Sequence, residues 1–281
     1  MSDVIAVIGA GQMGNGIAHV CAAAGIPVTM IDVSADALAK AKATIEKNFD
    51  RQIKKGAIDG AARDAALSKL STSTDLGAVS TATVVIEAAT ENVQLKFKIF
   101  GELDRLAGTG AILATNTSSI SITEIAAQTK RPELVIGMHF MNPVPVMQLI
   151  EIIRGLATSD ATLAHTVALS KALGKTPVEA NDYPGFIANR VLLPMINEAV
   201  FCVMEGVGTP EAVDTVMKLG MNHPMGPLAL ADLIGLDTCL AILEVLHTGL
   251  GDSKYRPCPL LRKYVAAGWL GRKSGRGFYT Y

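Results

Sequence analysis

The feature that most constrains this chain is the glycine-rich hexapeptide Gly9–Gly14. It follows a short aliphatic run at residues 4–8, and residues 12–24 have the pattern of a helix that ends at Gly25. A second aliphatic run, residues 28–31, stops at Asp32. A strand, a glycine turn, a helix and a second strand that ends in an acid predict a βαβ unit at the start of the chain.

The glycine spacing, G-x-G-x-x-G, indicates dinucleotide binding. Gly9 permits a tight turn, Gly11 lets the backbone approach a pyrophosphate, and Gly14 allows the helix to pack closely on the strand. The helix N-terminus offers N–H groups to the phosphates. Asp32 is placed to accept hydrogen bonds from the adenine ribose and to repel a 2′-phosphate, which favours NAD(H) over NADP(H). The alternatives are a glycine turn without a ligand and an FAD site, for which the chain lacks the usual extra length.

The remaining chain divides into two regions. Strand-like runs at residues 83–87, 111–114, 134–138 and 148–153 alternate with helical patterns, including a long helix from Ser34 to about Lys55. After Tyr183, the segments 186–206, 210–219 and 228–248 all have helical patterns. We therefore predict an α/β fold: a Rossmann-type doubly wound parallel sheet over residues 1–183, followed by a smaller all-α C-terminal domain over residues 184–281.

Charge and cysteine usage exclude several classes of protein. The 25 basic and 26 acidic residues give a net charge of −1, which does not favour nucleic acid or a charged membrane surface as a partner. Residues 4–31 carry no charge, yet glycines, Asn15 and Pro27 make a membrane span improbable, so the expected location is cytoplasmic. The four cysteines and five histidines form no metal-ligand pattern, so we expect free thiols and no metal site.

A base is needed if the reaction is hydride transfer from an alcohol, and His139 has the best position for it. It follows the run 134–138, at the carboxyl edge of the predicted sheet, where ligands bind in such folds. Glu151 lies within an apolar run and is costly to bury without a partner, which His139 could provide. The alternative, equally favoured by the pattern, is that Glu151 faces solvent on an edge strand.

Two further polar residues have an open interpretation. Ser118 belongs to the segment Asn116–Ser119, which follows the run 111–114 and could equally cap the next helix. Asn189 lies early in the first helix of the second region, where the pattern by itself favours a solvated position.

Several segments in order resemble the 3-hydroxyacyl-CoA dehydrogenases, the short soluble form that includes 3-hydroxybutyryl-CoA dehydrogenase. The resemblance covers essentially the whole chain, with one small departure at Ala114–Thr115, where the family often has Ala/Ser-Ser. The segments that carry it are Gly9–Gly14, Glu87–Asn92, Ala114–Ser119, Gly137–Pro145, Asp182–Arg190, Pro224–Pro227 and Gly271–Tyr279.

The resemblance implies an NAD-dependent oxidoreductase of (S)-3-hydroxyacyl-CoA, in fatty acid or butanoate metabolism, with His139 as general base and Glu151 as its partner. It implies that Ser118 and Asn189 bind the oxygen on substrate C3, which replaces the open interpretations above. The expected cofactor residues are Gly9, Gly11, Gln12, Met13, Gly14, Asp32, Glu91, Lys96, Asn116, Ser118, Asn142 and Lys273.

For the CoA tail, one face of the helix from Ser34 carries a basic stripe of Lys47, Arg51, Lys54 and Lys55, of which we assign Arg51 and Lys54 to the phosphates. The segment 228–246 is apolar, and the resemblance implies a homodimer through this domain that would cover it. Two other functions stay open: a dehydrogenase of a free short β-hydroxy acid, and a non-catalytic NAD-binding relative.

Overall fold

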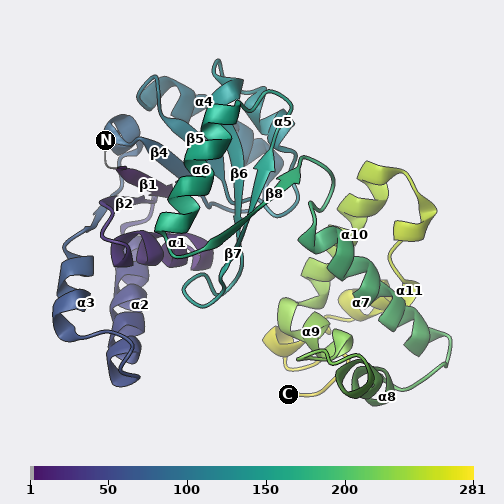
Figure 1. Cartoon of the computed structure of the whole chain (residues 1–281). Coiled ribbons are helices and arrows are strands. Elements are labelled where there is room, and N and C mark those ends of the chain that lie inside the picture. The colour runs from purple at the N-terminus through teal and green to yellow at the C-terminus, as the bar shows by residue number, and fades with distance from the viewer. Residues whose placement is uncertain (1–2) are drawn as a thin grey trace. The chain divides into compact units, whose positions relative to one another are not determined.

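The structure, a computed structural model, describes residues 3–281. The chain forms two compact units, the first ending at Asp182 and the second running from Tyr183 to Tyr281 (Figure 1). The first is a sheet with helices on both faces, and the second is helical. Each unit is described by itself.

The first unit is built on an eight-stranded sheet with the order β3-β2-β1-β4-β5-β6-β7-β8. The order reverses between β1 and β4, which is the switch point where ligands bind in open α/β sheets. The strands are β1 (Ile5–Ile8), β2 (Val28–Ile31), β3 (Leu70–Ser73), β4 (Val84–Glu87), β5 (Ile112–Thr115), β6 (Val135–Phe140), β7 (Leu149–Arg154) and β8 (Thr176–Asn181).

The sheet is mostly parallel, as predicted for a doubly wound fold, and one pair of strands, β6 and β7, is antiparallel. The reason is the connection between them: residues 141–148 are too few for the crossover that a parallel pair needs. The antiparallel register pairs His139 with Glu151. Parallel pairing resumes between β7 and β8, which are joined through a helix.

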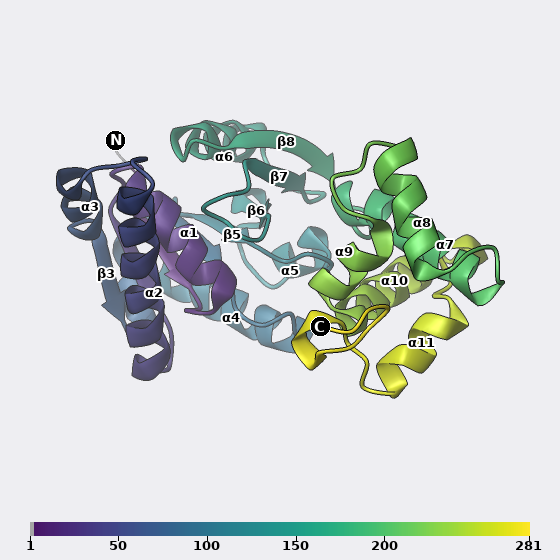
Figure 2. The same ribbon diagram turned by 90° about the horizontal axis from the view of Figure 1, so that it is seen from below.

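Helices cover both faces of this sheet (Figure 2). Side chains of α1, α2 and α6 share one apolar core with alternate residues of the strands. On the opposite face, Ile122 of α5 lies against Gly137 of β6. The helices of this unit are α1 (Gln12–Ala23), α2 (Ala35–Lys54), α3 (Gly60–Leu67), α4 (Val93–Leu106), α5 (Ile122–Ala126) and α6 (Asp160–Ala172), with short 3-10 turns at Leu76–Thr81 and Pro132–Leu134.

Helix α2 forms as its sequence predicts. The Ser34 hydroxyl accepts a hydrogen bond from Ala37 N and caps the first turn. Leu38, Ile45 and Phe49, spaced for one face of a helix, are buried, and Ile53 at the end of the same face is half-buried. The exposed face carries the basic stripe.

The two strands that the sequence did not indicate are the edges of the sheet. Strand β3 has the sequence Leu-Ser-Thr-Ser and β8 contains Pro177, so neither is an aliphatic run. Each has one neighbouring strand and is largely exposed, so it needs no continuous apolar sequence, and Pro is tolerated at a sheet edge.

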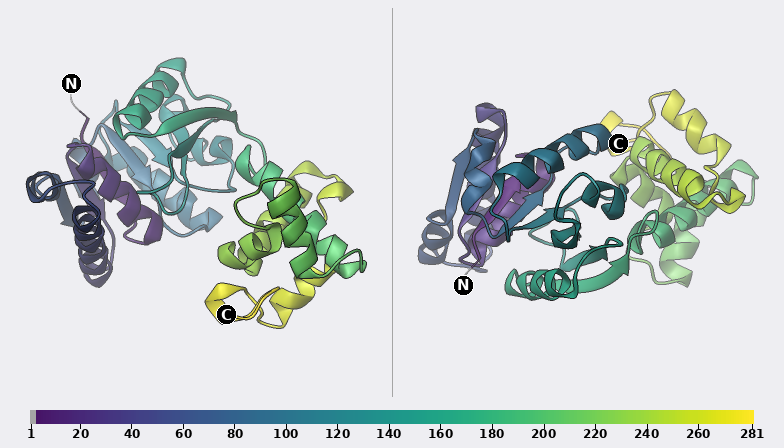
Figure 3. Two further views of the ribbon diagram at one scale, coloured as in Figure 1. Left: turned by 60° about the horizontal axis from the view of Figure 1, so that its bottom comes forward. Right: turned by 90° about the horizontal axis from the view of Figure 1, so that it is seen from above.

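The second unit is a cluster of helices around its own apolar core, drawn green to yellow in Figure 3. The predicted helix 228–248 is two helices, because Gly235 has a φ of 104° that interrupts it. The helices are α7 (Ala188–Met204), α8 (Pro210–Thr215), α9 (Pro227–Ile234), α10 (Leu236–Leu250) and α11 (Pro259–Ala266), with short turns at Val216–Gly220, Ser253–Tyr255 and Arg272–Ser274. Among the described residues, no helix is long and apolar enough to cross a membrane.

Candidate functional site

The three glycines of the first turn are required for three different reasons. Gly9 has a φ of 101°, and a Cβ there would lie 2.7 Å from the carbonyl oxygen of Ala88. A Cβ on Gly14 would overlap the carbonyl oxygen of Gly9, so helix and strand could not approach as they do. A Cβ on Gly11 would meet nothing within 4 Å. The backbone at Gly11 is therefore open to a ligand, as a pyrophosphate site requires.

The carboxylate of Asp32 is fixed against this turn. Its Oδ2 accepts a hydrogen bond from Ala10 N at 2.8 Å, and its Oδ1 accepts one from Ser34 N at 2.9 Å. Each oxygen keeps a second lone pair that can accept a ribose hydroxyl. No side chain caps α1, which leaves its first N–H groups for a phosphate. The turn, the helix and the acid together fit an NAD(H) molecule.

His139 and Glu151 form a buried pair across the antiparallel strands. The distance from His139 Nδ1 to Glu151 Oε2 is 2.8 Å, and the residues are 9% and 1% exposed. Strand β7 lies between β6 and β8, so Glu151 is not on an edge strand. Because a carboxylate only accepts, His139 Nδ1 carries the donated hydrogen, and the neutral ring has its basic site at Nε2.

Glu91 gathers the turn that contains Ser118. Its Oε1 accepts hydrogen bonds from Thr117 Oγ1 at 2.5 Å, from Ser118 N at 2.9 Å and from Ser119 N at 3.1 Å. It also accepts from the hydroxyls of Ser118 and Ser119. Burial by itself would raise the pKa of Glu91, but the charge of Lys96 and these hydrogen bonds outweigh it and lower the pKa below its ordinary value.

Behind this turn lies an ion pair to whose acid the sequence analysis gave no role. Lys96 Nζ lies 2.7 Å and 2.9 Å from the two carboxylate oxygens of Glu87, and both residues are almost completely buried. Glu87 also accepts from Thr115 Oγ1 and Ala89 N, and Lys96 lies 3.5 Å from Glu91. The sequence does carry a signal for Glu87, because it is a single acid at the end of the apolar strand β4 and is costly to bury without a partner, as Glu151 is.

Two asparagines predicted near the cofactor connect neighbouring segments. Asn116 Oδ1 accepts a hydrogen bond from Phe140 N at 2.9 Å, which ties the end of β5 to the end of β6. Asn142 Oδ1 accepts one from Gln12 Nε2 at 3.1 Å, which ties the β6–β7 loop to the start of α1. The predicted cofactor residues of the first unit therefore gather at the carboxyl edge of its sheet.

The other predicted residues belong to the second unit or to the end of α2. Asn189 and Lys273 belong to the second unit: Asn189 is buried in the first turn of α7, and Lys273 Nζ donates to Asp237 Oδ2 at 2.7 Å. Arg51 and Lys54 are exposed near the end of α2.

Both units of the chain match known proteins in sequence. Residues 4–183 match the family described as 3-hydroxyacyl-CoA dehydrogenase, NAD binding domain, and residues 185–281 match its C-terminal domain. A probable 3-hydroxybutyryl-CoA dehydrogenase of Bacillus subtilis is 61% identical over 99% of this chain and 96% of the relative. A 3-hydroxybutyryl-CoA dehydrogenase of Bradyrhizobium diazoefficiens is 57% identical over 99% of this chain and 94% of its own.

A solved structure extends the match to three dimensions. The (S)-3-hydroxybutyryl-CoA dehydrogenase PaaH1 of Ralstonia eutropha superposes with a TM-score of 0.98 at 54% identity, covering 100% of this chain and 99% of the other. The first unit is thus an NAD-binding domain, and the cofactor is NAD(H). With both of its domains matched in order, the chain belongs to the 3-hydroxyacyl-CoA dehydrogenase family.

Proposed function

We propose that this dehydrogenase interconverts (S)-3-hydroxybutyryl-CoA and acetoacetyl-CoA with NAD(H). The relatives that carry this substrate in their names match nearly the full length of the chain. The observation that carries the proposal is the buried pair of His139 and Glu151 at 2.8 Å. A histidine held by an acid at the carboxyl edge of the sheet is the base that alcohol oxidation needs.

In the oxidation, His139 acts as general base. Its Nε2 takes the proton of the C3 hydroxyl, while bound NAD⁺ supplies the hydride acceptor. Glu151 keeps the ring in the tautomer with hydrogen on Nδ1 and stabilises the imidazolium that forms. In the reduction, protonated His139 returns the proton to the oxygen on C3.

The oxygen on C3 becomes more negative during the reaction than in the ketone, and hydrogen-bond donors aimed at it lower the barrier. We assign this role to the Asn189 amide and to the Ser118 hydroxyl, whose one hydrogen turns from Glu91 toward the substrate oxygen. Glu91 holds the turn of Ser118 through the backbone N–H groups of Ser118 and Ser119. Glu91 is therefore a positioning residue for Ser118 as well as a cofactor neighbour.

For the cofactor, the glycine turn with Gln12 and Met13 takes the pyrophosphate and Asp32 the adenine ribose. The remaining assigned cofactor contacts are Glu91, Lys96, Asn116, Ser118, Asn142 and Lys273. For the CoA tail, the basic stripe along α2 and its C-terminal end offers four exposed cations, with Arg51 and Lys54 between Lys47 and Lys55. Lysine and arginine side chains form charge-assisted hydrogen bonds to phosphates, so we assign the phosphates of CoA to Arg51 and Lys54.

We also propose a cytoplasmic homodimer formed through the second unit. The four cysteines are free thiols, as is usual in a reducing compartment. The segment 228–246 was expected to be an exposed apolar surface covered by a dimer, but most of its apolar side chains lie in the core of their own unit. The support is instead a group of exposed apolar side chains in the second unit, which includes Val216, Leu219 and Met221.

The direct test follows NADH absorbance with acetoacetyl-CoA, with free acetoacetate and with NADPH as parallel arms. The proposal predicts turnover with acetoacetyl-CoA and NADH, and little with free acetoacetate. Preference for the free acid would establish a dehydrogenase of short β-hydroxy acids instead. A folded protein that binds NADH and turns over neither substrate would be the non-catalytic relative.

A further inference from the structure

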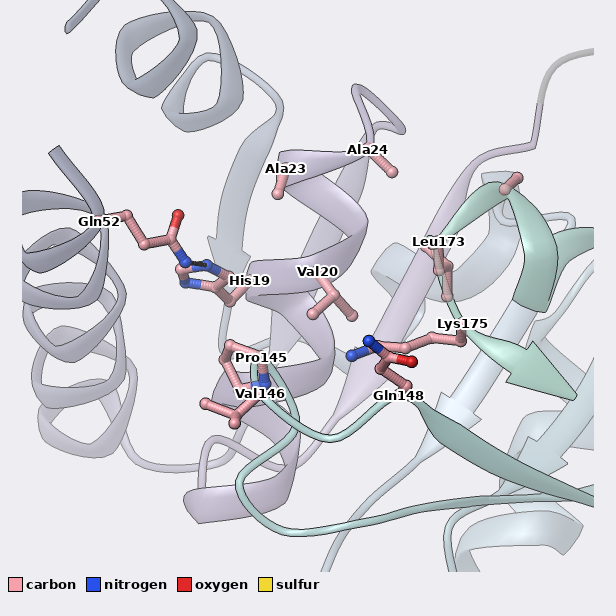
Figure 4. Close-up of a pocket in the computed structure, with 12 residues that line it drawn as sticks. His19, Val20, Ala23, Ala24, Gln52, Pro145, Val146, Gln148, Leu173 and Lys175 are labelled. Carbon is pink, nitrogen blue, oxygen red and sulfur yellow. Dashed lines mark hydrogen bonds between the residues drawn. The ribbon is translucent and has the colours of Figure 1, made fainter. Parts of the chain in front are cut away.

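A cavity of about 450 Å³ lies in the first unit, away from the His139–Glu151 pair (Figure 4). Its walls come from α1, the end of α2, the β6–β7 loop and the turn between α6 and β8. His19 and Gln52 meet on one side of it, and Lys175 and Gln148 lie on the other, with Val20 between them (Figure 4). Nothing in the dehydrogenase chemistry above uses these side chains.

The charge of this cavity has one sign. Among the described residues that line it, Lys175 is the only one with a formal charge, and none is an acid. Lys175 Nζ donates to the carbonyl oxygens of Val144 and Met147 at 2.5 Å and 2.7 Å. An ammonium has three hydrogens, so one donor remains. Burial lowers the pKa of Lys175, because it disfavours the charged ammonium. An anion beside the ammonium would favour the charged form and would itself be stabilised by the positive charge.

His19 adds a polar group with unmet hydrogen-bonding capacity. Its ring is 1% exposed, stacks on Phe49 at 4.1 Å between centroids, and places Nε2 3.2 Å from Gln52 Nε2. Because an amide nitrogen only donates, His19 Nε2 accepts and the hydrogen of the neutral ring lies on Nδ1. That Nδ1 has no partner among residues 3–281. Burial and the nearby Lys175 lower the pKa of His19 to about 4, so the ring is neutral near pH 7.

The other lining residues are mostly apolar. Ala23 and Ala24 form an exposed rim on α1, and Val20, Pro145 and Leu173 line the interior. A cavity of this size can hold a small molecule, and its lining combines polar groups on two sides with apolar residues between them. One cation without an acid beside it selects an anionic head, and Val20, Pro145 and Leu173 can contact a short alkyl body.

We propose that this cavity binds a small amphipathic monoanion, a short-chain carboxylate, at a site separate from the NAD(H) and acyl-CoA sites. Its carboxylate faces Lys175 and its alkyl chain lies along Val20 and Leu173. The site also touches the loop that carries Asn142, since Pro145 and Val146 line the cavity and Lys175 holds two carbonyls of the same loop.

The test titrates hexanoate into the full chain at pH 7, with NADH and CoA present at saturation, and measures binding by ligand-observed NMR and calorimetry. For a ligand of this size we expect a Kd on the order of 1 mM. Hexanamide has the same shape without the charge and is expected to bind about tenfold more weakly. The readout is binding, so it does not depend on dehydrogenase turnover.

Variants connect binding to this cavity. Ala23→Leu places a larger side chain on the exposed rim, and loss of hexanoate binding is expected. Ala39→Leu makes the same change at an exposed position of α2 that does not line the cavity, and binding should be unchanged. Lys175→Met keeps the length of the side chain and removes the cation, and hexanoate binding is expected to weaken about tenfold. If Lys175→Met fails to fold, the Ala23 and Ala39 variants still decide.

Four results would overturn the proposal: no hexanoate binding by folded wild type, equal binding by Ala23→Leu, equal binding of hexanamide, or displacement of hexanoate by CoA. The last would make the cavity part of the acyl-CoA site. Absence of acetoacetyl-CoA turnover with hexanoate binding intact would refute the proposed function and leave this inference standing.

Discussion

The ion pair of Glu87 and Lys96 gives a sharp test of how the site is held together. The residues are 0% and 1% exposed, and Lys96 Nζ lies 2.7 Å from Glu87 Oε1. With an effective dielectric constant near 20, the attraction at that distance is about 6 kcal/mol. The change to make is Lys96→Met, which keeps the length of the side chain and leaves Glu87 buried without its cation.

The free energy of unfolding should fall by about 3–5 kcal/mol, because the carboxylate keeps only the hydrogen bonds from Thr115 and Ala89. Adding Glu87→Gln to Lys96→Met removes the uncompensated charge and should restore about half of the loss or more. Urea denaturation followed by far-UV circular dichroism measures both steps.

A matched control lies on the same helix. Arg105 pairs with Glu102 on α4, with side chains 64% and 40% exposed, so Arg105→Met should cost less than about 1 kcal/mol. A loss from Lys96→Met as small as that of the control would show that the buried pair does not stabilise the fold. So would a double variant whose loss is the sum of the two single losses, because the partners would then not interact.

Three further predictions concern the glycine turn, the buried His19 and the pair of His139 and Glu151. Gly11→Ala should leave the melting temperature unchanged, since its Cβ meets no protein atom, but weaken NADH binding at least tenfold, since the Cβ lies where the pyrophosphate approaches. Gly14→Ala should also destabilise the fold, because its Cβ overlaps a carbonyl oxygen. Differential scanning calorimetry and NADH titration separate the two effects. Burial lowers the pKa of His19 from 6.5 in the unfolded chain to about 4 in the folded protein. Its contribution to the free energy of unfolding is therefore complete above pH 6.5 and is lost as the pH falls toward 4, a loss on the order of 3 kcal/mol. His19→Phe should flatten the pH dependence of the free energy of unfolding in this range. Glu151→Gln should lower kcat by about 10³ with the Kd of NADH unchanged, and a kcat within tenfold of wild type would exclude Glu151 from orienting the base.

Much of the first unit could be predicted because its interior strands are buried on both faces. Such strands read as aliphatic runs, and β1, β2, β4, β5, β6 and β7 were all indicated in this way. The edge strands β3 and β8 gave no such signal, because the exposure of an edge removes the need for apolar residues. Gly235 divides one apolar segment into two helices through a positive φ that composition does not reveal.

The candidate site divides along similar lines. His139 and Glu151 were plausible partners from burial cost, but only the antiparallel register of β6 and β7 brings them opposite each other. Glu87 was as much a lone acid in an apolar strand as Glu151, yet its partner Lys96 lies on a helix, and helix-to-strand contacts have no simple sequence spacing. The proposed role of Asn189 has no signal in the local sequence, where the pattern by itself favoured a solvated helix position, and in the structure the residue is buried.

If His139 moves the proton during hydride transfer, its removal slows the transfer itself, which is measured by single-turnover oxidation of NADH by acetoacetyl-CoA in wild type and His139→Gln. We expect a transfer rate lower by about 10²–10⁴ in the variant, with the Kd of NADH changed less than about threefold. A variant that transfers hydride within tenfold of the wild-type rate would contradict it.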